Sequence, residues 1–259
     1  MNNPQIAIVG FGNVGFHLTK RLFEIGIPPC LICTRDAKKT QNLLDQIGIQ
    51  SPVTSDKDLS QSALDFVILT VSDTAISDII ANYRFPKNAI IIHTSGSQPL
   101  EILAQFEQHG VMYPIQTFSL AKSVNFEKVP ILIEGNSENT EIAVEEFASL
   151  LSSSIRHASS EERLKVHMAA VIACNFSNKL YEIAEDILRD TSIDLADLQP
   201  LLEETVRKAV SLGANQAQTG PAARGDSNII SKHLDSLKDE PEILRIYKMM
   251  TQAIQKSNL

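Results

Sequence analysis

The sequence lacks tryptophan, a long apolar segment and an excess of basic residues. No apolar run approaches the ~18 residues that a membrane-spanning helix needs. Lysine and arginine together number 23 against 31 aspartates and glutamates, and the resulting net charge of −8 argues against nucleic acid or an anionic membrane as the main partner. The first residues carry neither the basic region nor the apolar core of a signal peptide, so we expect a cytoplasmic protein.

Cysteine is rare as well, with three in 259 residues. Cys30 and Cys33 form a C-x-x-C motif, but they lie in an apolar run, and a strand would send their side chains to opposite faces. No second cysteine pair completes a zinc site. We therefore predict buried structural thiols and no metal site.

The most informative feature present is a glycine motif directly after an apolar run. Residues 6–9 lead into a G-x-G-x-x-G motif, and residues 16–23 continue as an amphipathic helix. In the dinucleotide fingerprint the first glycine permits a tight turn, the second lets backbone approach a pyrophosphate, and the third lets helix and strand pack closely. The phosphates would lie at the amino end of the helix. The predicted cofactor-binding residues are Gly10, Gly12, Asn13, Val14 and Gly15. The alternative is a glycine-rich turn in an ordinary α/β domain.

Apolar runs alternate with amphipathic segments through the first 157 residues, which is typical of a doubly wound α/β sheet. The expected strands are 6–9, 30–34, 65–71, 89–93, 111–113, 129–133 and 154–157. The expected helices are 16–23, 36–47, 75–83, 99–109 and 138–151.

After residue 158 only helical patterns remain. Ser159 and Ser160 supply an N-cap, and Glu161 and Glu162 an acidic first turn, for a long helix to about residue 190. Further helices are expected over 194–212, 227–236 and 241–256. We therefore predict a Rossmann-type domain over residues 1–157 and an all-α domain over residues 158–259.

The residues after the second strand distinguish NAD from NADP. An acidic side chain there suits the ribose hydroxyls of NAD, whereas basic or hydroxyl side chains suit the 2′-phosphate of NADP. Thr34 and Arg35 occupy this place, and Asp36 is better explained as the N-cap or a first-turn residue of the next helix. We therefore predict that Thr34 and Arg35 bind NADP; the alternative is a solvated charge cluster at a strand end.

Small polar residues end two later strands of the expected sheet. Ligands bind outside the carboxyl ends of such strands, so we expect this backbone to pass close to ribose and nicotinamide. The predicted cofactor residues are Val71, Ser72 and Thr94, and the predicted substrate-side residues are Ser95 and Gly96.

The long helix is apolar around most of its circumference, so we expect it to be a buried spine. It nevertheless carries His167, Asn175 and Asn178, which at about 100° per residue fall within one narrow stripe. Buried amides need partners, and a stripe that faces the cleft between the domains would offer them to a ligand. The alternative is that both asparagines cap or bridge neighbouring helices.

The loop 219–226 holds a second group of candidate residues. We predict that Arg224 binds a substrate carboxylate in forked geometry while Thr219 and backbone N–H groups bind its other edge. The alternative is a turn between helices with an Arg224–Asp226 surface pair.

The whole chain resembles known families. A fingerprinted Rossmann domain followed by an all-helical domain with a long first helix resembles pyrroline-5-carboxylate reductase, ketopantoate reductase and 6-phosphogluconate dehydrogenase. More closely, residues 112–118 (MYPIQTF), 167–175 and 219–226 (TGPAARGD) resemble a bacterial family described as Rossmann-like with a C-terminal domain of unknown function. This resemblance implies an NADP-linked reductase that works as a homodimer with interlocked helical domains.

The chain departs from its hydroxyacid-dehydrogenase relatives at one position. In those relatives a lysine one turn before the matching asparagine serves as the acid/base; Asn175 fits the asparagine, but Val171 stands one turn earlier. The lysine mechanism therefore does not transfer directly. The candidate proton donors are His167, Tyr113 or a water held by Asn175, and His93 is either a further candidate or a structural residue at a strand end.

Together these features predict an NADP-dependent oxidoreductase that transfers hydride between nicotinamide and a small anionic imino or keto substrate. An imine that arrives protonated needs less acid catalysis, as in the comparison with pyrroline-5-carboxylate reductase. Two alternatives stay open. One is a non-catalytic NADP-binding sensor or partner protein, and the other is a hydride exchanger with a deazaflavin carrier.

Overall fold

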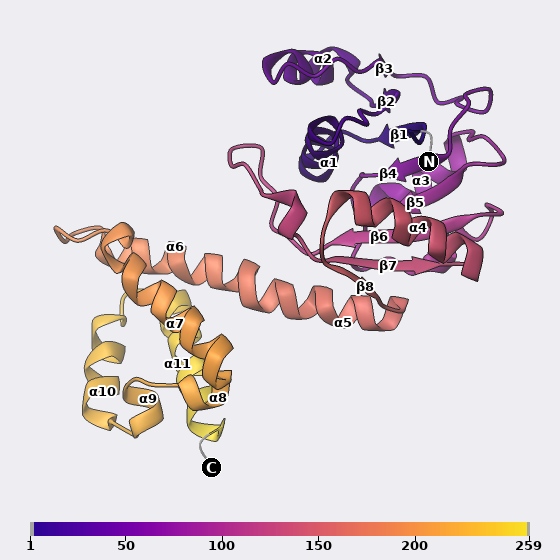
Figure 1. The fold of residues 1–259 in the computed structure, drawn as a ribbon. Helices are drawn as coiled ribbons and strands as arrows, with labels where there is room; N and C mark the ends of the chain where they lie inside the picture. The colour runs from indigo at the N-terminus through magenta and orange to yellow at the C-terminus, as the bar shows by residue number, and fades with distance from the viewer. Residues whose placement is uncertain (1–2, 258–259) are drawn as a thin grey trace. The chain divides into compact units, whose positions relative to one another are not determined.

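The computed structural model describes residues 3–257, which form two compact units divided between residues 174 and 175 (Figure 1). The sheet ends at His157, the residue at which the sequence placed the domain boundary. The compact units instead divide within the long helix, because the beginning of this helix packs on the sheet.

The first unit contains an eight-stranded sheet in the order β3-β2-β1-β4-β5-β6-β7-β8. The strands are β1 (Ile6–Val9), β2 (Leu31–Cys33), β3 (Val53–Thr54), β4 (Phe66–Leu69), β5 (Ile90–His93), β6 (His109–Pro114), β7 (Ile131–Gly135) and β8 (Ile155–His157). Strands β1 to β6 are parallel, β7 is antiparallel to β6, and β8 is parallel to β7. The strand order reverses beside β1, where ligands bind in doubly wound sheets. The prediction of a Rossmann-type α/β fold is confirmed.

Helices cover both faces of this sheet. The helical elements of the first unit are α1 (Asn13–Glu24), α2 (Ala37–Gln46), η1 (Asp73–Ala75), α3 (Ile76–Asn82), η2 (Leu100–Leu103), η3 (Phe126–Lys128), α4 (Glu138–Leu151) and α5 (Ser160–Ala170). The π-helical segment η4 (Val171–Phe176) follows α5 and contains the division between the two units. Side chains of α1, α2 and α4 pack with one set of alternating strand residues, such as Ile8 and Ile68. Side chains of α3 and η2 pack with the opposite set, such as Val9 and Leu69. The period-two alternation of the strands therefore builds two cores.

Two predictions in this unit were wrong or incomplete. The expected helix over 99–109 is only the 3₁₀ turn η2, after which i→i+3 bonds such as Phe106 N to Leu103 O turn the chain into β6. Gly110 belongs to β6 and pairs with Gly135 of β7. A Cβ on Gly110 would lie 2.8 Å from the Glu134 carbonyl oxygen, so the two strands pack closely here. The two-residue strand β3 was not predicted because it is too short to show a period.

The long helix begins as predicted but is not buried. Ser159 and Glu162 form a capping box at its start. The expected buried spine is wrong for this chain on its own: Met168, Ile172 and Phe176 are 57%, 56% and 59% exposed. The π-helical segment also breaks the stripe argument, because a π turn rotates less per residue than the α-helical value of about 100°.

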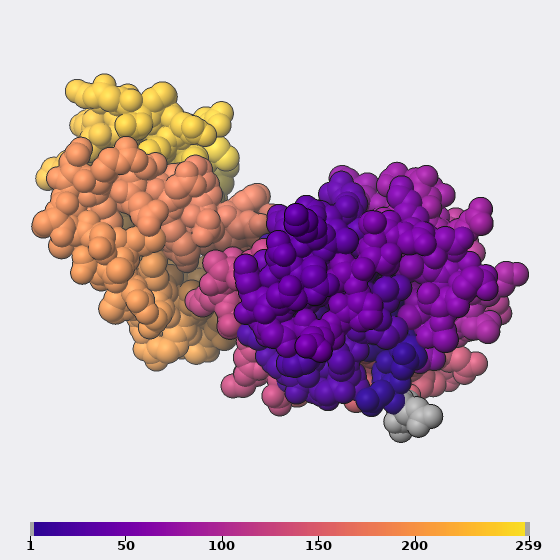
Figure 2. Space-filling model, turned by 90° about the horizontal axis from the view of Figure 1, so that it is seen from above, coloured from indigo at the N-terminus to yellow at the C-terminus, as the bar shows by residue number. Residues whose placement is uncertain are grey.

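The second unit is helical. Its elements are α6 (Ser177–Leu188), η5 (Leu195–Leu198), α7 (Gln199–Leu212), α8 (Ala214–Ala217), α9 (Pro221–Arg224), α10 (Ser227–Ser236) and α11 (Pro241–Ser257). Helix α7 ends before Gly213, whose φ of 87° favours glycine. The loop 219–226 contains the short helix α9, which was not predicted. Figure 2 shows orange and yellow segments, including α11, at the surface of this unit. Within residues 3–257 no helix is long and apolar enough to cross a membrane.

Candidate functional site

The glycine turn between β1 and α1 is shaped to leave its backbone uncovered. A Cβ on Gly10 would lie 2.6 Å from Val71 Cγ1, and one on Gly15 would lie 2.6 Å from Thr70 Oγ1. A Cβ on Gly12 would meet nothing within 4 Å, so the space beside Gly12 is open. Helix α1 begins directly after Gly12 without a side-chain cap. The turn therefore fits a pyrophosphate bound by the first N–H groups of α1.

The neighbouring strand β4 holds this turn in place. The Thr70 hydroxyl donates to the Gly10 carbonyl oxygen at 2.7 Å, and the Thr70 N–H donates to the Val9 carbonyl oxygen at 2.8 Å. The Gly10 N–H donates to the Cys33 carbonyl oxygen of β2 at 2.8 Å. The turn is thus fixed from both sides of β1 before any ligand arrives.

The end of β2 presents the residues predicted to select NADP. The Arg35 side chain is exposed and has no hydrogen bond or ion pair with any residue of the range 3–257. Asp36 accepts a hydrogen bond from the Lys39 N–H at 2.9 Å and caps α2, as the sequence predicted. Thr34 is half-buried, and its hydroxyl oxygen accepts from Thr40 at 3.4 Å. Arg35 is therefore a charged group at this strand end that is available to an anion.

The later strand ends use their hydroxyls mainly to shape the backbone. Thr94 donates to the Leu69 carbonyl oxygen at 3.1 Å and ties β5 to β4. The Ser95 hydroxyl oxygen accepts from the Ser97 and Gln98 N–H groups at 3.1 and 3.0 Å. The hydroxyl oxygens of Ser72 and Thr74 lie 3.3 Å apart. Ser95, predicted on the substrate side, thus builds the loop that carries Gly96.

Three of the predicted residues come together at the carboxyl edge of β5 and β6. The Tyr113 hydroxyl lies 3.1 Å from His167 Nδ1, and the two rings meet edge to face with centroids 5.9 Å apart. A Cβ on Gly96 would lie 2.7 Å from His167 Nδ1 and 2.7 Å from Tyr113 Cζ. The loop 94–99 can approach the Tyr113–His167 pair this closely only because residue 96 is glycine.

Two further residues lie beside this pair. Asp73 and Ser97 belong to the strand ends that were expected to face the cofactor, but they were not predicted as site residues. Ser97 donates to the Asp73 carboxylate at 2.5 Å. Burial raises the pKa of the Tyr113 hydroxyl, and the negative charge of Asp73 raises it further. Asp73 follows Val71 and Ser72 directly after β4, at the end of a strand that was expected to face the cofactor. This place in the sequence could have indicated Asp73 as a site residue.

His93 is a structural residue of the loop. Its side chain is 0% exposed, and its Nδ1 accepts from the Ser95 N–H at 3.2 Å. Burial, together with the positive charge of Arg163, lowers its pKa to about 4. His93 is therefore a buried, neutral imidazole that stabilises the loop carrying Gly96, and it is not exposed to a substrate.

The remaining predicted residues belong to the second unit. Asn175 and Asn178 are exposed, and neither amide forms a side-chain hydrogen bond with a residue of the described chain. Thr219 is exposed, and so is Arg224 at the end of α9. The alternative Arg224–Asp226 pair is not formed, because Asp226 accepts from the Ile229 N–H at 3.2 Å and caps α10. Arg224 therefore remains available to a ligand.

The thiols of the C-x-x-C motif are not paired. Cys30 and Cys33 are free, and each thiol donates to a backbone carbonyl oxygen, of Ile6 and of Asp56 respectively. Burial raises the pKa of Cys33 to about 11, so this thiol stays protonated at neutral pH. Cys33 is buried as predicted, whereas Cys30 is only half-buried.

Two family models match successive parts of the chain. Residues 5–96 match the family described as "NADP oxidoreductase coenzyme F420-dependent", and residues 129–254 match a domain of unknown function. A comparison with curated proteins gave no match.

Solved structures resemble the whole chain. A protein from Bacteroides fragilis that has been assigned as an NADP oxidoreductase shares 31% identity, covers 98% of each chain and has a TM-score of 0.89. A reductive aminase from Aspergillus terreus, in complex with NADPH and ethyl levulinate, has 15% identity over 98% of this chain and 95% of its own, with a TM-score of 0.70. The 1-pyrroline-5-carboxylate reductase of Streptococcus pyogenes has 16% identity over 99% of this chain and 100% of its own, with a TM-score of 0.62. The chain therefore belongs to the NADP oxidoreductase family in which a domain of the coenzyme F420-dependent type precedes this domain of unknown function, and its cofactor is NADP.

Proposed function

We propose that this protein transfers hydride between nicotinamide C4 and the carbon of a C=N or C=O double bond in a small substrate. One observation carries the proposal. The uncovered turn at Gly12 and the Tyr113–His167 pair lie at the same carboxyl edge of the parallel strands β1 to β6, within one compact unit. This edge is where doubly wound sheets bind cofactor and substrate.

The cofactor supplies the hydride, and the Tyr113–His167 pair supplies the proton. Burial and the nearby carboxylate raise the pKa of Tyr113, so its hydroxyl is protonated at neutral pH and able to donate to the substrate nitrogen or oxygen. His167 Nδ1, at 3.1 Å, can return a proton to the phenolic oxygen. One hydride and one proton together convert the imine to an amine or the ketone to an alcohol.

We infer that the substrate is a small imine that carries a carboxylate. The guanidinium of Arg224 is exposed and forms no hydrogen bond or ion pair within the described residues, and Arg224 lies in the loop with Thr219. Its forked guanidinium suits a carboxylate. An imine is favoured over a ketone because the structural relatives include a reductive aminase and a pyrroline-5-carboxylate reductase.

We also propose that the protein works as a homodimer. Met168, Ile172 and Phe176 on the long helix are more than half exposed, and Val210 on α7 is 83% exposed. Large exposed apolar areas mark interaction surfaces. Analytical ultracentrifugation tests this proposal: a sedimenting mass of one chain at micromolar concentration would contradict it.

The experiment for the activity is NADPH oxidation across a panel of cyclic imines, imino acids and keto acids. We expect Tyr113→Phe to lower kcat by roughly a hundredfold, because a positioned acid contributes about that much, while the Kd for NADPH is unchanged. Tyr83→Phe is the matched control, since Tyr83 packs in the core against Phe85. Arg224→Ala should raise KM at least about tenfold for an imine that carries a carboxylate, but not for its neutral analogue. Tight NADPH binding without oxidation of any panel member would instead support a sensor.

A second candidate has its own observation. The family model over residues 5–96 is described as coenzyme F420-dependent, which favours hydride exchange between NADP and a deazaflavin carrier. The absorbance of the oxidised deazaflavin decreases on reduction, so mixing it with NADPH and the protein tests this activity directly. Deazaflavin reduction without imine reduction would replace the first proposal by the second.

A further inference from the structure

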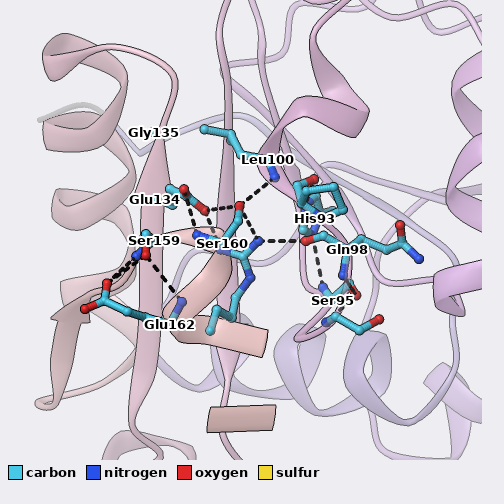
Figure 3. Close-up of polar contacts among 12 residues, drawn as sticks. His93, Ser95, Gln98, Leu100, Glu134, Gly135, Ser159, Ser160 and Glu162 are labelled. Carbon is cyan, nitrogen blue, oxygen red and sulfur yellow. Dashed lines mark hydrogen bonds and ion pairs between the residues drawn. The ribbon is translucent and has the colours of Figure 1, made fainter. Parts of the chain in front are cut away.

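A buried arginine joins the first turn of α5 to the sheet. Arg163 is 1% exposed, and its Nη1 donates to the Glu134 carboxylate of β7 at 2.5 Å. Ser160, one turn earlier on α5, donates to the same carboxylate through its hydroxyl at 2.8 Å and through its N–H at 3.0 Å. Figure 3 shows Glu134 and Ser160 at the centre of these contacts. The start of α5 is therefore held on the end of β7 by three hydrogen bonds.

The same two side chains of α5 also hold the loop that carries Gly96. Arg163 Nη2 donates to the Gln98 carbonyl oxygen at 2.7 Å, and the Ser160 hydroxyl oxygen accepts from the Leu100 N–H at 2.9 Å. Figure 3 shows Gln98 and Leu100 next to Ser160, each joined to the central group by a dashed line. Helix α5 and the loop 94–100 are therefore linked at the position where both leave the sheet.

His167 follows Arg163 by four residues, so the two side chains lie on the same face of α5. Arg163 contacts the far part of the loop, and His167 contacts Gly96 at its near part. A rotation of α5 about its axis would move both contacts together. Both contacts therefore depend on the same rotation of α5 about its axis.

Stability alone is a poor explanation for this ion pair. Arg163 Nε is buried without a hydrogen-bond partner in the described chain, and an unpaired buried donor costs free energy. Replacing a buried ion pair by well-packed apolar residues is often neutral or stabilising. Apolar residues, however, have no directional contacts with which to select one rotation of the helix.

We propose that Arg163 and Glu134 are positioning residues, which hold α5 at the rotation that places His167 against Tyr113 and Gly96. This proposal rests on the proposed role of the Tyr113–His167 pair as the proton source, but its test needs no substrate.

The test measures the Tyr113–His167 contact directly. In the full-length protein with ¹⁵N-labelled histidine, the imidazole nitrogen shifts of His167 report the hydrogen bond at Nδ1, and Tyr113→Phe should displace them. We expect this displacement to fall by half or more in an Arg163→Lys background and to vanish in Arg163→Met. Lysine can reach one acceptor but not Glu134 and Gln98 together, which gives the graded result. Glu134→Gln should behave like Arg163→Lys.

A destabilising substitution away from the Arg163–Glu134 contacts provides the control. Phe147→Leu removes a buried ring of α4 that stacks on Phe66. It should lower the melting temperature while leaving the full Tyr113→Phe displacement. NADPH affinity should stay within about threefold in every variant, because no residue of the Gly10–Gly15 turn is a hydrogen-bonding partner of Arg163 or Glu134.

Two results would overturn the proposal. One is an unchanged Tyr113→Phe displacement in Arg163→Met and Glu134→Gln. The other is an equal loss of the displacement in Phe147→Leu, which would show that lowered stability alone explains the effect. A chain that shows the expected coupling but reduces no imine would contradict the proposed activity and leave the positioning role in place.

Discussion

Replacing His93 by asparagine should remove a specific part of the acid sensitivity of this protein. Asparagine keeps an oxygen that can accept from the Ser95 N–H, as His93 Nδ1 does at 3.2 Å, but it cannot take up a proton. The folded pKa of His93 is about 4, mainly because of burial. The ordinary value is near 6.5, so the unfolded chain binds a proton at pH values where the folded chain does not.

This difference fixes both the sign and the size of the effect. The folded pKa lies below the unfolded one, so the contribution of His93 to stability is full above pH 6.5 and is lost as the pH falls. Linkage gives a decrease in the free energy of unfolding of about 1 kcal/mol between pH 7 and 5.5, and of about 2 kcal/mol between pH 7 and 4.5. Below pH 4 the decrease levels off at about 3 kcal/mol.

Urea unfolding of the natural protein and of His93→Asn at pH 7, 5.5 and 4.5 measures this contribution. The carboxylates titrate in both proteins, so the difference between the two curves isolates His93. The stability advantage of the natural protein at pH 7 should shrink by about 1 and about 2 kcal/mol at the two lower values. An advantage that stays constant from pH 7 to 4.5 would refute the assignment of His93 as a buried neutral imidazole.

His157 provides a control of opposite sign. The Glu141 carboxylate, 2.7 Å from His157 Nδ1, raises the pKa of this exposed histidine. Its contribution to stability is therefore present at low pH and lost as the pH rises through the folded pKa. The advantage of the natural protein over His157→Asn should grow between pH 7 and 5.5, whereas the advantage over His93→Asn shrinks.

Three further predictions concern the cofactor edge. Arg35→Ala should weaken NADPH binding by roughly tenfold to a hundredfold and leave NADH binding unchanged, because a charge-assisted contact to the 2′-phosphate is worth about 1.5–3 kcal/mol. Equal losses of affinity for both nucleotides, or a similar loss in the control Arg84→Ala, would contradict this prediction. Gly12→Ala should leave the melting temperature unchanged, since a Cβ there meets nothing within 4 Å. It should lower NADPH affinity, because the methyl group occupies the space for the phosphates. A calorimetric titration with NADPH identical to that of the natural protein would contradict the placement of the pyrophosphate at this turn. Gly96→Ala should lower turnover and keep NADPH affinity, because its Cβ would lie 2.7 Å from both rings of the Tyr113–His167 pair. Full activity in this variant would show that the pair takes no part in catalysis.

The cofactor half of the fold could be predicted from the sequence because its signals are local. The G-x-G-x-x-G motif lies between a strand and a helix at the expected positions, and the side chain of Asp36 caps α2 as expected. Helix α4 begins and ends at the predicted residues, with Ser137 as its cap. Each of these features is determined by residues within one or two turns of each other, which a sequence displays directly.

The other half of the site depends on contacts that sequence spacing does not show. Glu134 and Arg163 are 29 residues apart and come from a strand and a helix, so no local pattern joins them. The π-helical segment η4 changes the rotation per residue along the long helix, and the apolar sequence of that segment does not predict this change. The exposed face of the same helix was misjudged for a related reason. An apolar pattern predicts that a face is covered, but not whether the covering surface belongs to the same chain.

The departure from the lysine mechanism bears on our proposal that the Tyr113–His167 pair supplies the proton. A lysine on the long helix would act from one element, and its flexible side chain could tolerate small rotations of that helix. The pair found here needs two elements, since Tyr113 comes from β6 and His167 from α5. A hydrogen bond of 3.1 Å between two short, rigid rings fails when either element rotates. If the pair takes the place of the lysine, as we propose, the helix must be held against the sheet by directional contacts. The buried Arg163–Glu134 ion pair, one turn before His167, is placed where that requirement is greatest.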